Sequence, residues 1–240
     1  MSSRSPSERS SPLVWEGSLP ATWLLIALLV VLHGATGLSD LGRVSWWEGV
    51  FLDRDLQLRV GVGGQYRAFV DGGEGWRLAT SVLLHGDALH LLVNVLALLG
   101  LGRILEPWVG GTRFLAWFAL GGVLGSGLSH AMGLVQSDGA SGGAFALLGA
   151  AAVLGWRSRD RLSVDDRRLL GPVLWAFIVG NVLLSFLLPF VDAAGHLGGL
   201  FTGLVLGLWP GDRGGLRWGD AAVVASFATT CAYGFISVCS

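Results

Sequence analysis

Residues 194–207 have the sequence AGHLGGLFTGLVLG, and this stretch decides the fold that we expect. Glycine recurs in it every four residues, at Gly195, Gly199, Gly203 and Gly207, so a helix here carries one stripe without side chains. Small residues at this interval let two transmembrane helices approach closely. A second stretch, DGASGGAFALLGA at 138–150, offers small residues at the same interval, namely Gly142, Ala146 and Ala150. The sequence therefore predicts that these two helices pack against each other.

The composition of the whole chain places this pair of helices in a membrane. Of the 240 residues, 52% are hydrophobic and only 14% are charged, whereas an average soluble domain has about 25% charged residues. A soluble domain cannot bury so much apolar surface, so lipid must cover part of it. The formal net charge of -1 gives no support to a nucleic-acid partner, which needs a clustered basic face.

Seven apolar stretches approach the roughly 20 residues that a helix needs to cross a bilayer. They are 20–38, 87–105, 112–134, 141–157, 168–190, 193–210 and 219–238. We therefore predict an all-α, polytopic transmembrane bundle with a six-helix core and a seventh, C-terminal helix. The corresponding domains are a disordered N-terminal tail at 1–18, a membrane domain at 19–210, and a linker with the extra helix at 211–240.

The long connection between the first two spans, residues 39–86, carries charges of both signs together with Trp46, Trp47 and Phe51. Such aromatic side chains favour contact with the membrane interface, and the shape of this loop is left open. The basic residues, all Arg, indicate the orientation. Apart from those in this long connection, they precede the first span and follow the second, fourth and sixth, while the loops after the third and fifth carry none. Because Arg-rich loops stay in the cytoplasm, we expect a cytoplasmic N-terminus in a bacterial inner (plasma) membrane.

Polar groups at membrane depth are costly, so each of them needs an explanation. Ser141 stands at the start of an apolar helix and is flanked by Gly139 and Gly142. The free N–H groups at a helix N-terminus suit a developing oxyanion. Ser141 is therefore a candidate nucleophile, and the alternative is a serine that only caps the helix. With no lysine in the chain, a Ser–Lys dyad is excluded.

His196 borders the glycine stripe near the start of its helix. If the two small faces meet, its imidazole can reach the Ser141 hydroxyl; the alternative is a histidine that only bonds two helices together. His90 and Asn94 lie four residues apart on one helix face, about one turn after His85, and both can donate hydrogen bonds to a negative charge. This group is open to two other interpretations, a structural polar cluster or metal or haem ligation, although no HExxH or HxxxH motif is present.

Taken together, these motifs resemble the rhomboid intramembrane proteases over residues 77–207. The resemblance rests on Trp76-Arg77, His85, the pair His90 and Asn94, Glu106 before Gly110, the GASG of 139–142 and the GHLGG of 195–199. Two positions depart from the family pattern: Ala146 replaces a frequent glycine, and Gly195 replaces the usual alanine. Both residues stay small, so we expect the helix contact to survive.

The resemblance implies roles for individual residues. Ser141 is the nucleophile, His196 is the base, and the oxyanion hole consists of His90, Asn94 and the Ser141 backbone N–H. The supporting residues are Gly139, Phe145, Gly199 and His85, with Phe145 packed under the histidine. Arg77 and Glu106 are implied to brace the loop before the span at 87–105. Asp192, four residues before His196, is interpreted as an interfacial carboxylate, so the site is a dyad.

We thus expect an intramembrane serine endopeptidase that hydrolyses peptide bonds in or near transmembrane segments through an acyl-enzyme. Its partners are transmembrane protein substrates and the lipid bilayer, with no nucleic acid, no cofactor and no metal. The alternatives are a non-catalytic rhomboid-like scaffold or chaperone, and a histidine-based haem, metal or transport protein. A narrower one is a sortase-like rhomboid that trims C-terminal anchor helices. The natural substrate and the oligomeric state are left open.

Overall fold

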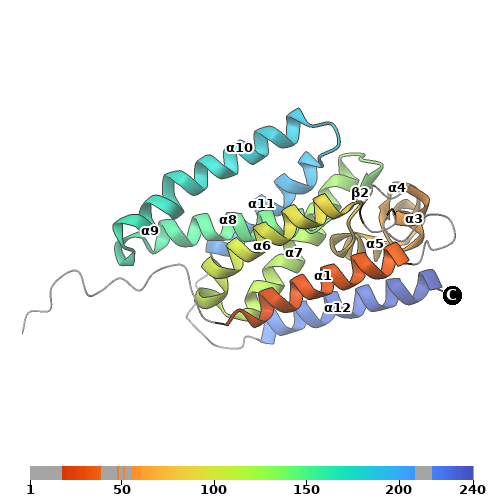
Figure 1. The fold of residues 1–240 in the computed structure, drawn as a ribbon, viewed down its shortest axis with the longest axis horizontal. Helices are drawn as coiled ribbons and strands as arrows, with labels where there is room; N and C mark the ends of the chain where they lie inside the picture. The colour runs from red at the N-terminus through yellow and green to blue at the C-terminus, as the bar shows by residue number, and fades with distance from the viewer. Residues whose placement is uncertain (1–17, 39–47, 49–50, 52–55, 209–217, 240) are drawn as a thin grey trace, which may run out of the picture.

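The computed structural model describes residues 18–38, 48, 51, 56–208 and 218–239, which form a bundle of helices (Figure 1). The elements are α1 (Pro20–Leu38), α3 (Leu56–Gly61), β1 (Gln65–Tyr66), α4 (Arg67–Asp71), α5 (Arg77–Thr80), η2 (Ser81–Leu83), α6 (Ala88–Val109), α7 (Gly111–Ala131), β2 (Gln136–Ser137), α8 (Ser141–Arg157), η3 (Arg159–Arg161), α9 (Val164–Arg168), η4 (Leu169–Val173), α10 (Leu174–Leu187), α11 (Ala193–Leu208) and α12 (Trp218–Cys239). The tail at 1–17, Trp46, Trp47 and the linker at 211–217 lie outside the described residues.

The predicted fold class is confirmed, with one refinement of the spans. Among the described residues, five helical segments are long and apolar enough to cross a membrane: α1, α6, α7, the run from α9 to α10, and α12. The other two predicted spans are shorter helices, α8 with 17 residues and α11 with 16. Helix α8 buries most of its residues in protein, although Trp156 near its end is exposed.

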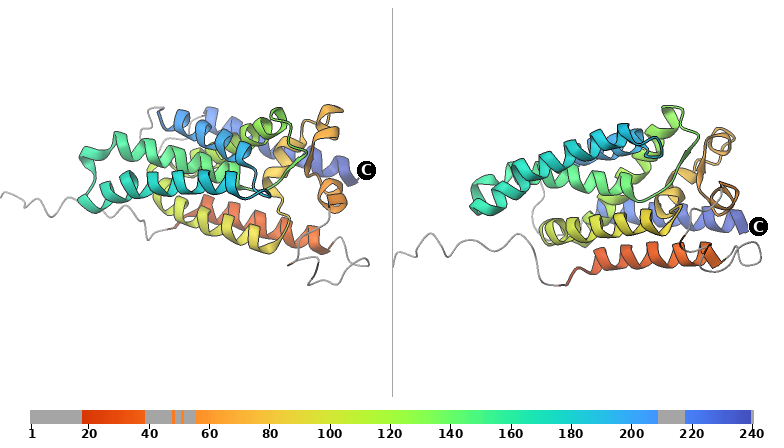
Figure 2. Two further views of the ribbon diagram at one scale, coloured as in Figure 1. Left: turned by 90° about the horizontal axis from the view of Figure 1, so that it is seen from above. Right: turned by 45° about the horizontal axis from the view of Figure 1, so that its top comes forward.

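Helices α7, α8 and α11 pack together at the centre of the bundle, where backbone meets backbone. A Cβ atom added to Gly199 would lie 2.8 Å from the carbonyl carbon of Gly142, and one added to Gly203 would lie 2.5 Å from that of Ala146. Real Cβ atoms do not come so close, so only glycine fits on this side. The predicted contact between the two small-residue faces is therefore confirmed, and the structure adds its register, with Gly199 against Gly142 and Gly203 against Ala146. Figure 2 shows the long helices running side by side.

Part of the long loop before α6 is held by Arg77. Its guanidinium donates to the carbonyl oxygens of Val60 at 2.6 Å and Gly64 at 2.9 Å, and it pairs with Glu74 at 2.8 Å. The loop also adds strand β1, which pairs antiparallel with β2, in the connection before α8. The expected bracing role of Arg77 is thus confirmed.

The corresponding expectation for Glu106 is wrong. Its carboxylate accepts hydrogen bonds from the backbone N–H groups of Ala21 and Thr22, both at 2.9 Å. These groups belong to the first turn of α1, where no intrahelical partner exists and a negative charge is stabilising. Glu106 lies near the far end of α6 from the loop, so it caps α1 instead of bracing the loop.

The C-terminal helix α12 packs against the bundle at two levels. Near its start, Asp220 forms an ion pair of 3.0 Å with the buried Arg113 of α7. Near its end, Gly234 lies so close to α5 that an added Cβ would be 2.8 Å from a methyl carbon of Thr80. The seventh predicted helix is therefore a packed part of the fold, on the opposite side of the bundle from α10 (Figure 1).

Candidate active site

Ser141 begins α8 directly after a tight turn, and contacts from two other segments fix this turn. Gly139 has φ of +124°, a conformation that glycine adopts easily. Its N–H donates to the Ser81 carbonyl at 2.9 Å, and the next N–H, of Ala140, donates to Nε2 of His85 at 3.3 Å. An added Cβ at Gly139 would lie 2.6 Å from the His90 ring. The structure thus gives Gly139 and His85 a clear part in positioning the serine.

His196 of α11 lies against α8, on the helix face that carries Ser141 and Phe145. Its ring stacks on Phe145, with the ring centroids 4.2 Å apart and the planes inclined by 15°. Phe145 follows Ser141 by four residues, which places both side chains on one face of the helix. The packing of Phe145 under His196, implied by the resemblance, is therefore present.

Two further contacts hold His196 on its other sides. Its Nδ1 atom lies 2.7 Å from the hydroxyl oxygen of Ser185, on α10. Its backbone N–H donates to the Asp192 carbonyl at 3.1 Å. The ring is therefore fixed in plane by stacking and at one nitrogen by a hydrogen bond.

The third segment of the site is the start of α6. Asp87 caps this helix by accepting a 2.8 Å hydrogen bond from the His90 N–H. The rings of His85 and His90 meet edge to face, with centroids 5.1 Å apart. Asn94, one turn later, is buried and donates one amide hydrogen to the His90 carbonyl at 3.0 Å. The capped helix therefore places His90 beside Gly139, two residues before the serine.

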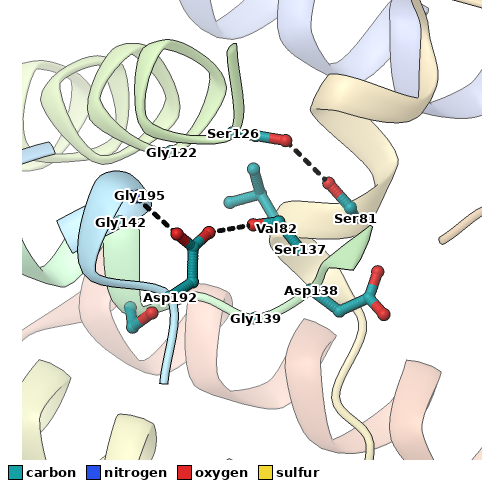
Figure 3. A pocket seen from close by; sticks show the side chains of 11 residues that line it. Ser81, Val82, Gly122, Ser126, Ser137, Asp138, Gly139, Gly142, Asp192 and Gly195 are labelled. Atoms are coloured by element: carbon teal, nitrogen blue, oxygen red, sulfur yellow. Dashed lines mark hydrogen bonds between the residues drawn. The ribbon is translucent and has the colours of Figure 1, made fainter. Parts of the chain in front are cut away.

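A small polar cavity of about 20 Å³ adjoins Ser141, which is room for roughly one water molecule. Figure 3 shows the side chains of Asp138 and Asp192 at this cavity. The polar side chains lining it, besides Ser141, are those of Ser81, Ser126, Ser137, Asp138 and Asp192. Small glycines such as Gly142 and Gly195 complete the wall, so that backbone groups also face the cavity.

Asp192 is a structural link between three segments, beyond the interfacial carboxylate expected for it. Its carboxylate accepts from the Gly195 N–H at 2.8 Å, which caps the start of α11. It also accepts from the hydroxyl of Ser137 at 2.5 Å and from that of Ser129, on α7. Asp192 thus ties the beginning of the His196 helix to α7 and β2.

Asp138 lies in the connection between β2 and α8, outside the membrane-spanning helices. Burial raises the pKa of this carboxyl to about 6, because loss of water disfavours the charged form. Hydrogen bonds from Gln136 and from the Gln65 N–H oppose the rise, as do the charges of Arg59 and Arg77. Asp138 therefore titrates in a range where a change of pH acts on the turn before Ser141.

Comparison with known proteins completes this description. Residues 72–211, more than half of the chain, match the family model for the Rhomboid domain. The chain belongs to the rhomboid family. This rhomboid is 35% identical over 202 residues to RHOMBOID-like protein 5 of Arabidopsis thaliana, an alignment that covers 79% of this chain and 64% of the relative.

Some of the relatives carry the word protease in their names. Rhomboid protease GluP of Bacillus subtilis is 32% identical over 178 residues, or 72% of this chain and 34% of GluP. Rhomboid-like protease 1 of Toxoplasma gondii is 32% identical over 172 residues, or 66% of this chain and 57% of the relative. This rhomboid thus spans about a third of GluP and just under two thirds of RHOMBOID-like protein 5.

Family membership and the apolar helices together make this rhomboid an integral membrane protein. Its relatives come from a bacterium, a plant and a parasite, so they carry no argument for the bacterial membrane expected from the sequence.

The sequence reasoning missed Ser185 and the partners of Asp192. Ser185 follows Asn181 by four residues on an apolar helix. A polar pair at that spacing is the sequence signal by which Ser185 could have been found.

Proposed function

We propose that this rhomboid is an intramembrane serine endopeptidase in which Ser141 is the nucleophile and His196 is the base. The observation that carries the proposal is the stack of His196 on Phe145, one turn after Ser141 on the same helix face. The backbone contact of Gly199 with Gly142 supports it, because it joins the two helices next to both residues. The protease names of GluP and the Toxoplasma relative support this class of activity.

The reaction proceeds in two steps through an acyl-enzyme. His196 takes the proton from the Ser141 hydroxyl as its oxygen attacks the scissile carbonyl carbon. The tetrahedral intermediate collapses with cleavage of the C–N bond, and His196 returns the proton to the leaving amine. A water molecule, deprotonated by His196, then attacks the ester and releases the carboxyl product together with the free serine.

The oxyanion is stabilised by His90, Asn94 and the Ser141 backbone N–H. The amide of Asn94 has two hydrogens, and its bond to the His90 carbonyl uses only one of them. Loss of a single oxyanion donor typically lowers the rate by about 10²–10³-fold. Gly139 and His85 act as supporting residues because they fix the turn before Ser141.

The substrate is a transmembrane protein whose helix unwinds locally, since an intact helix hides its carbonyl groups in its own hydrogen bonds. The arrangement of the Arg residues supports a cytoplasmic N-terminus. In that orientation Ser141 and His196 begin their helices on the outer side. The cleaved bond then lies near the outer end of the substrate helix.

Cleavage of a reconstituted model transmembrane substrate tests the proposal. We expect the wild-type protein to cleave it and both Ser141→Ala and His196→Ala to lose activity. Ser126→Ala is the matched control, because that hydroxyl lines the same cavity and its hydrogen-bond partner is Ser81, at 3.3 Å. Cleavage by the Ser141→Ala protein would contradict the proposal. The cleavage would then come from a contaminant, and the non-catalytic scaffold would be the better assignment for this chain.

A further inference from the structure

Helix α10 buries one polar side chain. Its buried residues are Leu174, Ile178 and Ser185, while neighbours of Ser185 such as Phe186 and Leu187 are 64% and 76% exposed. Most of this helix therefore faces lipid, and Ser185 points inward to α11. A buried hydroxyl is costly unless its hydrogen bonds are made, so its partners need an explanation.

The two partners of Ser185 determine which way its proton points. The hydroxyl oxygen lies 2.7 Å from the Asn181 carbonyl oxygen and 2.7 Å from Nδ1 of His196. A carbonyl oxygen only accepts, so the single hydroxyl proton belongs in the bond to Asn181. Without it there, two oxygen atoms would face each other at 2.7 Å with no hydrogen between them. The Ser185 oxygen is therefore the acceptor for a proton carried by Nδ1.

A neutral imidazole has one N–H, so a proton on Nδ1 leaves Nε2 as the unprotonated nitrogen. Nε2 is then the only ring atom that can accept a proton. We propose that Ser185 is a positioning residue that holds His196 in the tautomer with Nε2 free to act as the base. This inference rests on the proposed function, in which His196 deprotonates Ser141.

The proton inventory stays balanced through the reaction. When Nε2 takes the Ser141 proton, Nδ1 keeps its own proton and its hydrogen bond to the Ser185 oxygen. The hydroxyl proton of Ser185 stays on that oxygen and continues to be donated to the Asn181 carbonyl. Ser185 thus takes the place that a carboxylate holds in a Ser–His–Asp triad, but it is neutral. Within the described part of the chain, the titratable groups that act electrostatically on His196 are Asp192, on the segment before α11, and His90, on α6.

Substitution of Ser185 tests the proposal kinetically. A typical hydrogen bond contributes about 1 kcal/mol, so Ser185→Ala is expected to lower kcat about fivefold with little change in KM. Ser185→Thr should restore most of the rate, because a threonine hydroxyl also bonds to the carbonyl four residues earlier. The matched control is Ser237→Ala in α12, where the hydroxyl donates to the Tyr233 carbonyl at 2.9 Å in the same way. That variant should keep the wild-type rate.

The tautomer itself is measured by nitrogen NMR on protein labelled with ¹⁵N-histidine, with the His196 signals assigned by their loss in His196→Gln. We expect a protonated Nδ1 and an unprotonated Nε2 in the wild type and in Ser141→Ala, and a mixture of tautomers in Ser185→Ala. A wild-type protein with its proton on Nε2 would overturn the inference, as would a Ser185→Ala protein with unchanged kcat and tautomer. Cleavage by Ser141→Ala would instead overturn the proposed function, and the spectra would still decide the tautomer.

Discussion

Substitution of Gly199 by alanine tests how closely the two site-bearing helices must approach. The added methyl carbon would lie 2.8 Å from the carbonyl carbon of Gly142 and 3.1 Å from its Cα, and closer still to the carbonyl oxygen. Ordinary contacts of a Cβ atom begin near 3.4 Å. Helix α11 must therefore move away from α8 by more than half an ångström. The atoms that the methyl group would meet belong to the backbone of Gly142, and they cannot relieve the contact by a change of rotamer.

The expected consequences differ for stability and for activity. Overpacking of this kind typically costs about 1–3 kcal/mol, so the free energy of unfolding should fall by that amount. A displacement approaching 1 Å at a catalytic pair can lower the rate by about 10²-fold, so the loss of kcat should exceed what partial unfolding explains. Both are measurable in detergent, by thermal unfolding and by cleavage of a transmembrane substrate.

Gly127 provides the matched control. It lies in α7, and an added Cβ there would meet nothing within 4 Å. Gly127→Ala should therefore gain about 0.5–1 kcal/mol, because alanine loses less entropy than glycine in a helix. The reasoning is refuted if Gly199→Ala melts at or above the wild-type temperature and cleaves at the wild-type rate, as the Gly127 variant does.

Two other substitutions act on the carboxylates beside the site. Because the pKa of Asp138 is raised from 3.8 to about 6, the folded state prefers the protonated form, and the free energy of unfolding should fall by up to about 3 kcal/mol as the pH rises from about 4 to 6. Asp138→Asn should remove this dependence, and equal pH slopes of melting temperature in both proteins would contradict it. Asp192→Asn replaces an oxygen that accepts from two hydroxyls, so it should lower stability by about 2 kcal/mol; a melting temperature equal to the wild type would mean that the links of Asp192 to Ser129 and Ser137 contribute nothing.

The sequence was sufficient for the central contact of the fold because that contact is periodic. Glycine every four residues identified the face of α11 that packs on α8, whereas the register, with Gly203 against Ala146, comes from the structure. The seven apolar stretches were located from the length of their apolar runs, compared with the roughly 20 residues that a crossing needs. The predicted stretch 141–157 has the same bounds as α8, and the predicted stretch 193–210 begins at the same residue as α11.

The missed features depend on contacts between distant segments. Glu106 caps a helix that begins about 85 residues earlier in the chain, and no local pattern indicates such a partner. Ser185 meets His196 only because the chain turns back between α10 and α11. Asp192 likewise gains its hydroxyl partners from α7 and β2. Periodicity predicts which face of a helix is buried, but it does not predict which polar atom on another segment that face will meet.

The most direct test of the proposed pairing of Ser141 with His196 is the site of reaction with a fluorophosphonate, a probe that labels only activated serines. Mass spectrometry of the treated protein should find one adduct, on the peptide that contains Ser141, and the adduct should disappear in His196→Ala while the protein remains folded. An adduct on another serine, or labelling of Ser141 that does not depend on His196, would contradict the pairing of these two residues.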